Sequence, residues 1–159
     1  MASFPLTKPR SAAEVEKLPS RTLAYIGDSV YELAMRMHHV WSSSDPAGRL
    51  HSSVVGIVNA AHQAQLFVEL LPTVSEHEQG LLKHWRNAKL PSRPGSKSSR
   101  AEYARSTAFE AWIGYLFLTG QTERLLAQLV RARDPRPASP PAQTPNDTST
   151  EVDPDETLS

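Results

Sequence analysis

The sequence predicts an all-α fold, a single helical bundle followed by a disordered C-terminal tail. Nearly every segment between Pro and Gly residues carries apolar side chains at helical rather than alternating spacing. Several segments begin with a Ser that is followed three residues later by a Glu, which is the pattern of a helix capping box. Residues 135–159 differ, because they are rich in Pro, Ser and Thr and hold almost no large apolar side chains. We therefore expect one folded domain over 1–134 and a disordered acidic tail over 135–159.

Three helices are expected in the first half of the folded region. A short helix begins at Ser11, where SAAE has the form of a capping box. A long helix follows Pro19 and fades before the sequence WSSSDPAG. A third helix is expected over 50–71, and Pro72 ends it.

Three further helices are expected over 76–90, 100–119 and 121–134. Ser75 and Ser99 each have a Glu three residues later, so they cap the first two of these helices. Between those two helices lies a Pro- and Gly-containing loop, PSRPGSKS, and Gly120 ends the helix over 100–119.

Composition bounds the kind of protein. The chain has 159 residues and no cysteine, which excludes disulfides and thiolate zinc sites. The tail holds one basic and five acidic residues, so the formal charge of zero becomes 16 basic against 12 acidic residues in 1–134, or about +4. This sign favours an anionic partner. No apolar run of about 18 residues and no secretory signal is present, and we expect a cytoplasmic protein.

Asp28 stands in the middle of the long helix that follows Pro19. Apolar residues form one stripe of this helix, which is expected to be buried: Leu23, Ile26, Val30, Leu33, Met37 and Val40. A polar stripe lies opposite: Arg21, Tyr25, Asp28, Glu32, Arg36 and His39. The polar stripe can be explained as a face in water, but Asp28 and Glu32 at i and i+4 repel each other. Gly27 also weakens the helix, and such a residue is retained where another backbone or a ligand comes close, so an acidic pair beside it indicates a cation site.

Glu110 is a second carboxylate in an apolar setting. It is the only charged residue in AFEAWIGYLFLTG, a segment that is apolar on every side and is expected at the centre of the bundle. A structural ion pair with Arg or Lys is the alternative explanation, because an isolated buried carboxylate is strongly unfavourable. If the two helices cross near Gly27 and Gly114, however, Asp28 and Glu110 converge. Two carboxylates completed by water molecules are a ligand set that Mg²⁺ accepts, and the ion then promotes phosphodiester hydrolysis.

These two segments carry a resemblance to a known family. LAYIGDSVYE resembles the signature of the ribonuclease III catalytic domain, and FEAWIGYLFLTG resembles its second acidic segment. RNAK, the basic loop and YARSTAFEA are similar to the short branch called Mini-ribonuclease III, which lacks a double-stranded-RNA-binding domain. The similarity runs from about Leu18 to Leu129. It implies a Mg²⁺-dependent endoribonuclease of the ribonuclease III fold that acts on double-stranded RNA as a homodimer and matures both ends of the 23S ribosomal RNA precursor, to which a ribosomal protein can be bound.

The resemblance assigns roles residue by residue. Asp28 matches the aspartate of the signature and Glu110 the glutamate of the second segment, so both are expected to be catalytic and to hold the metal. Three further acidic positions of full-length ribonucleases III are occupied here by Arg21, Ala24 and Thr107, as in the short branch. Glu32, one turn beyond Asp28, is a candidate for indirect support of the metal through water.

A basic run lies between Lys83 and Arg105, with seven positive residues against one negative, Glu102. Because A-form RNA is contacted mostly through its backbone and 2′-hydroxyl groups, we expect this run to bind RNA. The residues assigned to RNA binding are Arg86, Asn87, Lys89, Arg93, Lys97 and Arg100. The alternative is a solvated helix end and loop.

Two functions of other classes compete with the enzyme. One is a non-catalytic helical RNA-binding or ribosome-assembly factor of the same fold, and the other is a plain helical interaction module. Both leave Asp28 and Glu110 unexplained. The six histidines have no H-E-x-x-H spacing, and the sequence holds no G-x-S-x-G, P-loop or G-x-G-x-x-G motif.

Overall fold

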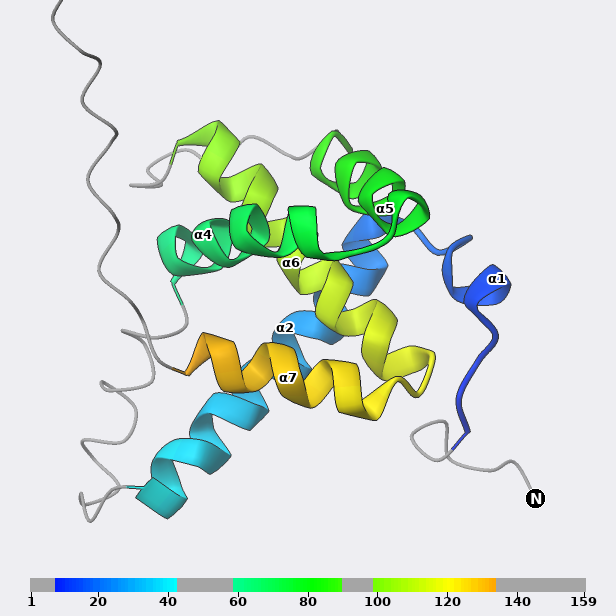
Figure 1. Ribbon diagram of the computed structural model, residues 1–159. Helices are drawn as coiled ribbons and strands as arrows, with labels where there is room; N and C mark the ends of the chain where they lie inside the picture. Colours follow the sequence, from blue (N-terminus) through cyan, green and yellow to red (C-terminus); the bar gives the residue numbers. More distant parts are fainter. Residues whose placement is uncertain (1–7, 43–58, 90–98, 134–159) are drawn as a thin grey trace, which may run out of the picture.

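The computed structural model describes residues 8–42, 59–89 and 99–133, and these residues form helices without any strand (Figure 1). The α-helices are α1 (Ala12–Val15), α2 (Ser20–Ser42), α4 (Ala60–Leu70), α5 (Glu76–Arg86), α6 (Arg100–Leu118) and α7 (Thr122–Ala132), with a 3₁₀ turn η2 (Leu71–Thr73). The expected all-α bundle is confirmed. The tail over 135–159 lies outside the described residues, so its disorder stays a prediction.

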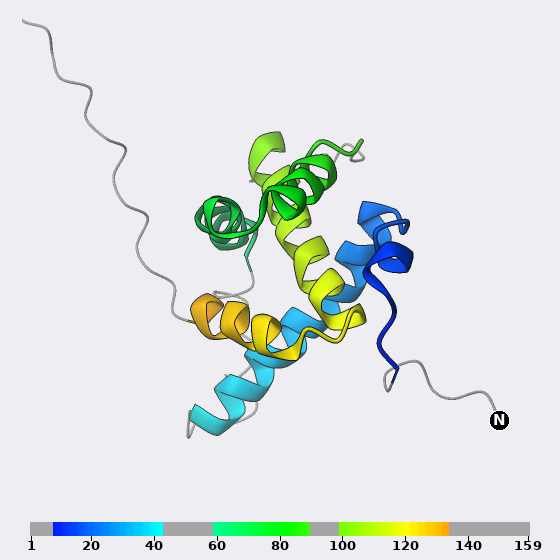
Figure 2. The ribbon, with the colours of Figure 1, turned by 45° about the vertical axis from the view of Figure 1, so that its right-hand side comes forward.

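Helix α6 is the centre of the bundle. It contacts α1, α2, α4, α5 and α7, and it runs between them in both views (Figures 1 and 2). Its buried side chains cover every side of the helix, as the uniformly apolar sequence predicts. Phe109, Trp112 and Leu116 are at most 1% exposed. Trp112 stacks on Tyr115, whose ring also contacts Trp85 of α5.

The predicted caps set several helix ends. Ser11 and Ser75 form complete capping boxes with Glu14 and Glu78. The Ser99 side chain accepts a hydrogen bond from the backbone N–H of Glu102 at the start of α6. Gly120 has a φ of 69°, a left-handed conformation that suits glycine and ends α6 as expected.

Two predicted helix bounds were wrong. Residues 50–58 of the helix expected over 50–71 lie outside the described residues, and the expected helix is interrupted at Asn59, which is extended and caps α4 by accepting a hydrogen bond from the His62 N–H at 2.8 Å. The helix expected over 76–90 ends at Arg86, where Asn87 is the C-cap. The spacing of apolar residues did not reveal these two caps, Asn59 at the start of α4 and Asn87 at the end of α5.

The face of α2 that packs on α6 also differs from the prediction. The buried residues are Leu23, Ala24, Gly27, Tyr31 and Met35. Of the stripe expected to be buried, Leu33, Met37 and Val40 are 60%, 53% and 54% exposed. The reason is that α6 approaches the side of α2 that carries Ala24 and Gly27, whose small size permits close contact. Among the helices of the described residues, none is both long and apolar enough to span a membrane.

Candidate active site

Helices α2 and α6 touch backbone to backbone at two glycines. A Cβ atom placed on Gly27 would lie 1.7 Å from the Glu110 carbonyl oxygen and 2.7 Å from the Gly114 nitrogen. A Cβ atom on Gly114 would lie 2.2 Å from the Leu23 carbonyl oxygen. Only glycine fits at both positions, so the crossing expected from the sequence is present.

This crossing brings the positions of the two anomalous carboxylates together. Asp28 directly follows Gly27, and Glu110 is the residue whose backbone Gly27 touches. Asp28 is exposed and Glu110 is partly buried, and both residues take part in polar or electrostatic interactions. A carboxylate is therefore present on each helix at the crossing, one of them open to solvent.

Tyr31 lies one turn after Gly27 on the buried face of α2. Its ring is fully buried and makes an edge-to-face contact with Phe109 of α6, with 5.9 Å between the ring centroids. Burial raises the pKa of the Tyr31 phenol, and the negative charge of Glu110 raises this pKa further. The charge of the Glu110 carboxylate thus influences the pKa of the buried phenol.

Glu32 has a partner of its own. It forms an ion pair with Arg36 one turn further along α2, and its side chain is 42% exposed. This pair offsets the repulsion between Asp28 and Glu32 that made the sequence unusual. An indirect role of Glu32 at the metal stays a prediction.

The residues at the crossing suit a divalent ion that takes few protein ligands. Across the three described segments there is no group of three or more His, Asp or Glu residues that could hold a metal. Mg²⁺ commonly binds through one or two carboxylates and keeps several water molecules, so a pair of carboxylates fits it better than an ion that requires a full protein shell. Asp28 and Glu110 are the residues that would hold such an ion.

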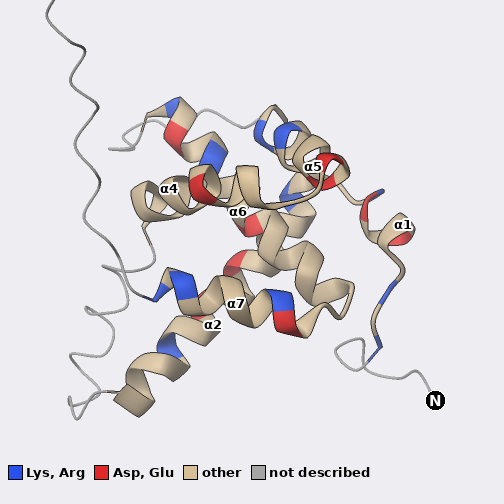
Figure 3. Cartoon of the chain, viewed as in Figure 1, with Lys and Arg blue, Asp and Glu red and all other residues tan. Residues whose placement is uncertain are grey.

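The described residues of the basic run between Lys83 and Arg105 lie at one end of the bundle. Figure 3 shows Lys and Arg on the C-terminal half of α5 and on the first turns of α6, which lie at the same end. The Arg86 side chain donates a hydrogen bond from Nε to Asn87 Oδ1 at 3.1 Å, while Lys89 and Arg100 are exposed. Arg93 and Lys97 lie outside the described residues.

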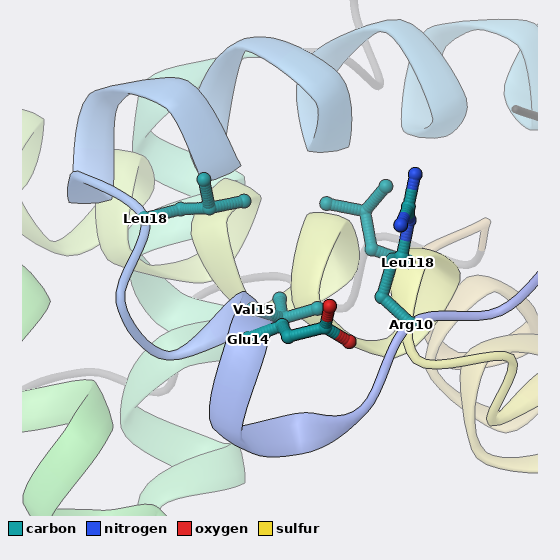
Figure 4. Close-up of a pocket in the computed structure, with 5 residues that line it drawn as sticks. All are labelled: Arg10, Glu14, Val15, Leu18 and Leu118. Carbon is teal, nitrogen blue, oxygen red and sulfur yellow. The ribbon is translucent and has the colours of Figure 1, made fainter.

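A surface hollow lies away from the crossing of α2 and α6 and is lined by other residues. It has a volume of about 270 Å³ and lies between the N-terminal segment and the end of α6 (Figure 4). Its lining consists of Arg10, Glu14, Val15, Leu18 and Leu118. None of the candidate site residues belongs to it, so it does not contribute to the candidate active site.

Comparison with known proteins decides the family. The model of the Ribonuclease III domain matches residues 21–121, a range that includes all of α2 except its first residue, all of α6, and the glycine crossing. The chain belongs to the ribonuclease III family. Members of this family are endoribonucleases that act on double-stranded RNA and depend on divalent metal ions, and this chain is an endoribonuclease of that family.

Individual relatives agree with this assignment. The chain is 42% identical to the Mini-ribonuclease 3 of Symbiobacterium thermophilum over 117 residues, which cover 74% of this chain and 89% of the relative. It is 41% identical to the Mini-ribonuclease 3 of Desulfitobacterium hafniense over 118 residues, which cover 74% and 72%. A crystal structure of a Fusobacterium nucleatum protein matches with a TM-score of 0.64 at 24% identity and covers 72% of this chain and 91% of that one. This last likeness supports the fold alone.

Proposed function

We propose that this endoribonuclease depends on Mg²⁺, that Asp28 and Glu110 are its catalytic metal ligands, and that it matures the 5′ and 3′ ends of the 23S ribosomal RNA precursor as a cytoplasmic homodimer. The observation that supports the site is the backbone contact between Gly27 and Glu110. This contact fixes the separation of the two helices that carry the carboxylates.

The residues of the chain have distinct tasks in this proposal. Asp28 and Glu110 would supply the oxygen ligands of a Mg²⁺ ion, and the chemistry supplied by such an ion would be polarisation of a phosphate and a lower pKa of bound water. Gly27 and Gly114 keep the two helices in register. The partial exposure of this side of the crossing leaves access for a phosphodiester.

Positive residues position the RNA. The end of α5, the segment directly after it and the start of α6 carry the described residues of the proposed RNA-binding surface: Arg86, Lys89 and Arg100. Asn87 is the C-cap of α5. Contacts from such residues to phosphates bind a duplex without reading its sequence. Arg93 and Lys97, which lie outside the described residues, are proposed to bind RNA from the sequence alone.

The exposed apolar side of α2 supports the homodimer. Leu33, Met37 and Val40 follow each other at spacings of four and three residues, so they share one side of the helix, and each is more than half exposed. Paired copies of a two-fold dimer would bury the same side of α2 in each protomer. Each dimer then holds two active sites, one for each strand of the duplex.

The proposed ribosomal RNA substrate rests on the resemblance of the sequence to the short Mini-ribonuclease III branch, and the relatives named Mini-ribonuclease 3, which the chain covers to 89% and 72% of their length, support membership of that branch. A ribosomal protein bound to the precursor is the proposed further partner. The non-catalytic factor is not favoured, because both carboxylates are retained at the crossing.

The test is cleavage of duplex RNA by the purified protein with and without Mg²⁺. Asp28→Asn keeps the size of the side chain and removes its charge, so we expect loss of cleavage with duplex binding and melting temperature retained. Glu110→Gln should behave alike. Glu123→Gln, which removes an exposed acid at the start of α7, is the matched control and should cleave normally. Near-normal cleavage by Asp28→Asn would refute the site.

A further inference from the structure

Tyr31 carries a buried polar group that the proposed mechanism does not use. Its side chain is 0% exposed, and among the described residues its hydroxyl has no hydrogen-bond partner. Buried hydroxyl groups are normally satisfied by protein or by ordered water. The Tyr31 hydroxyl is therefore a donor without an acceptor inside the bundle.

The position of Tyr31 places this donor at the helix crossing. Tyr31 follows Gly27 by four residues, so it lies one turn along the same face of α2, the face that packs on α6. Its ring contacts the edge or face of Phe109 at nearly perpendicular planes (87°), and Phe109 is the neighbour of Glu110. Burial raises the pKa of the phenol and the negative charge of Glu110 raises it further, so the Glu110 carboxylate lies within electrostatic reach of the hydroxyl.

Packing alone does not account for the hydroxyl. Phe at position 31 would fill the same space and keep the aromatic contact with Phe109 without burying an unsatisfied polar group. A nearby carboxylate would be a favourable acceptor for the hydroxyl, and since no acceptor among the described residues bonds it directly, one water molecule could form the bridge.

We propose that Tyr31 is a positioning residue for Glu110, and that its hydroxyl donates a hydrogen bond through one water molecule to the Glu110 carboxylate. The bridge orients that carboxylate toward Asp28, as groups behind metal ligands do in other sites. This inference rests on the proposed function, since it assigns Tyr31 a role toward a proposed metal ligand.

The experiment compares Tyr31→Phe with the wild type and with Tyr25→Phe. Tyr25 is on the same helix and 75% exposed, so the control makes the same chemical change away from the crossing. The first measurement is the melting temperature of each protein, without RNA, against the Mg²⁺ concentration. The second is single-turnover cleavage of saturating duplex RNA over the same Mg²⁺ series, together with the RNA affinity.

We expect Tyr31→Phe to melt at or above the wild-type temperature without Mg²⁺. The Mg²⁺ concentration at half effect should rise about 10-fold in both measurements, with RNA affinity unchanged, while Tyr25→Phe matches the wild type. An unchanged Mg²⁺ midpoint would overturn the inference, and so would a large fall in the metal-free melting temperature, which would show a purely structural hydroxyl. The wild type in the same series tests the proposed function separately: if it cleaves with Mg²⁺ while Tyr31→Phe has the same midpoint, only the role of Tyr31 is wrong.

Discussion

The glycine crossing makes a direct prediction about Gly27→Ala. The new Cβ atom would lie 1.7 Å from the Glu110 carbonyl oxygen, whereas real Cβ atoms essentially never come closer than 3.0 Å to such a neighbour. The helices must therefore separate locally by about 1.3 Å, the difference between these distances. Because the obstructing atom belongs to the backbone of α6, no side-chain rotation relieves the contact.

The expected loss of stability follows from two opposing effects. Overpacking of this kind costs roughly 1–3 kcal/mol, and a backbone obstacle places the cost at the upper end. Ala favours the helix over Gly by up to about 1 kcal/mol. The net loss is about 2 kcal/mol, which corresponds to a fall in melting temperature of roughly 10 °C for a domain of this size.

The same displacement acts on catalysis. A shift of about 1 Å at reacting groups can reduce a rate on the order of 100-fold, and here the shift separates the helices that carry Asp28 and Glu110. We expect single-turnover cleavage by Gly27→Ala to fall by that factor at a temperature where the variant is still folded.

Gly80→Ala is the matched control. Gly80 lies in α5, and a Cβ atom there would meet nothing within 4 Å. This variant should keep full activity and gain up to about 1 kcal/mol of stability from helix propensity. Melting curves and single-turnover cleavage of both variants decide the matter. If Gly27→Ala melted and cleaved like Gly80→Ala, the close crossing would be wrong.

Three further predictions concern other surfaces. Leu33→Asp should convert the dimer to a monomer, as measured by light scattering at micromolar concentration, and a wild type that is itself monomeric would contradict the proposed interface. Lys89→Ala and Arg100→Ala should each weaken duplex RNA binding and reduce the slope of log affinity against log salt by about one unit, whereas unchanged slopes would mean that these residues are only solvated. Arg124 Nη1 donates to Glu78 Oε1 at 2.6 Å, and this bond is the main reason that the pKa of Glu78 is lowered. A lowered carboxylate pKa stabilises the fold at pH values above the unfolded-state pKa of about 4.5, and this stabilisation is lost as the pH falls through the folded-state pKa. Arg124→Gln should therefore lower the melting temperature at pH 7 and much less at pH 3. An equal loss at both pH values would contradict the linkage.

Local signals predicted the helices and the crossing well. Ser11, Ser75 and Gly120 act within a few residues of themselves, so their effects can be read from the sequence. Gly27 was informative for a different reason, since a glycine inside a helix is unfavourable unless something comes close. The close contact it predicted is with the backbone of Glu110.

The buried face of α2 could not be predicted because apolar residues are not confined to the stripe that spacing favoured: Ala24, Tyr31 and Met35 lie outside it. Spacing favoured the side with the larger aliphatic residues, such as Leu33 and Val40, whereas α6 packs on the side with Ala24 and Gly27. Helical periodicity detects an apolar side but not its partner. The placement of Tyr31 depended on the same choice, and its position four residues after Gly27 was the signal that could have placed it.

The crossing of α2 and α6 also has a consequence for the newly made chain. Asp28 and Glu110 are about 80 residues apart in the sequence, so the proposed site requires closure of a long loop as well as formation of two helices. During synthesis, α2 leaves the ribosome long before α6 exists. In the proposed site, an incomplete chain therefore carries Asp28 without Glu110, and a misfolded chain does not bring the two carboxylates together, so we expect hydrolysis of RNA only after the bundle has closed. In a cell that contains much structured RNA, only the completely folded protein would then cleave RNA.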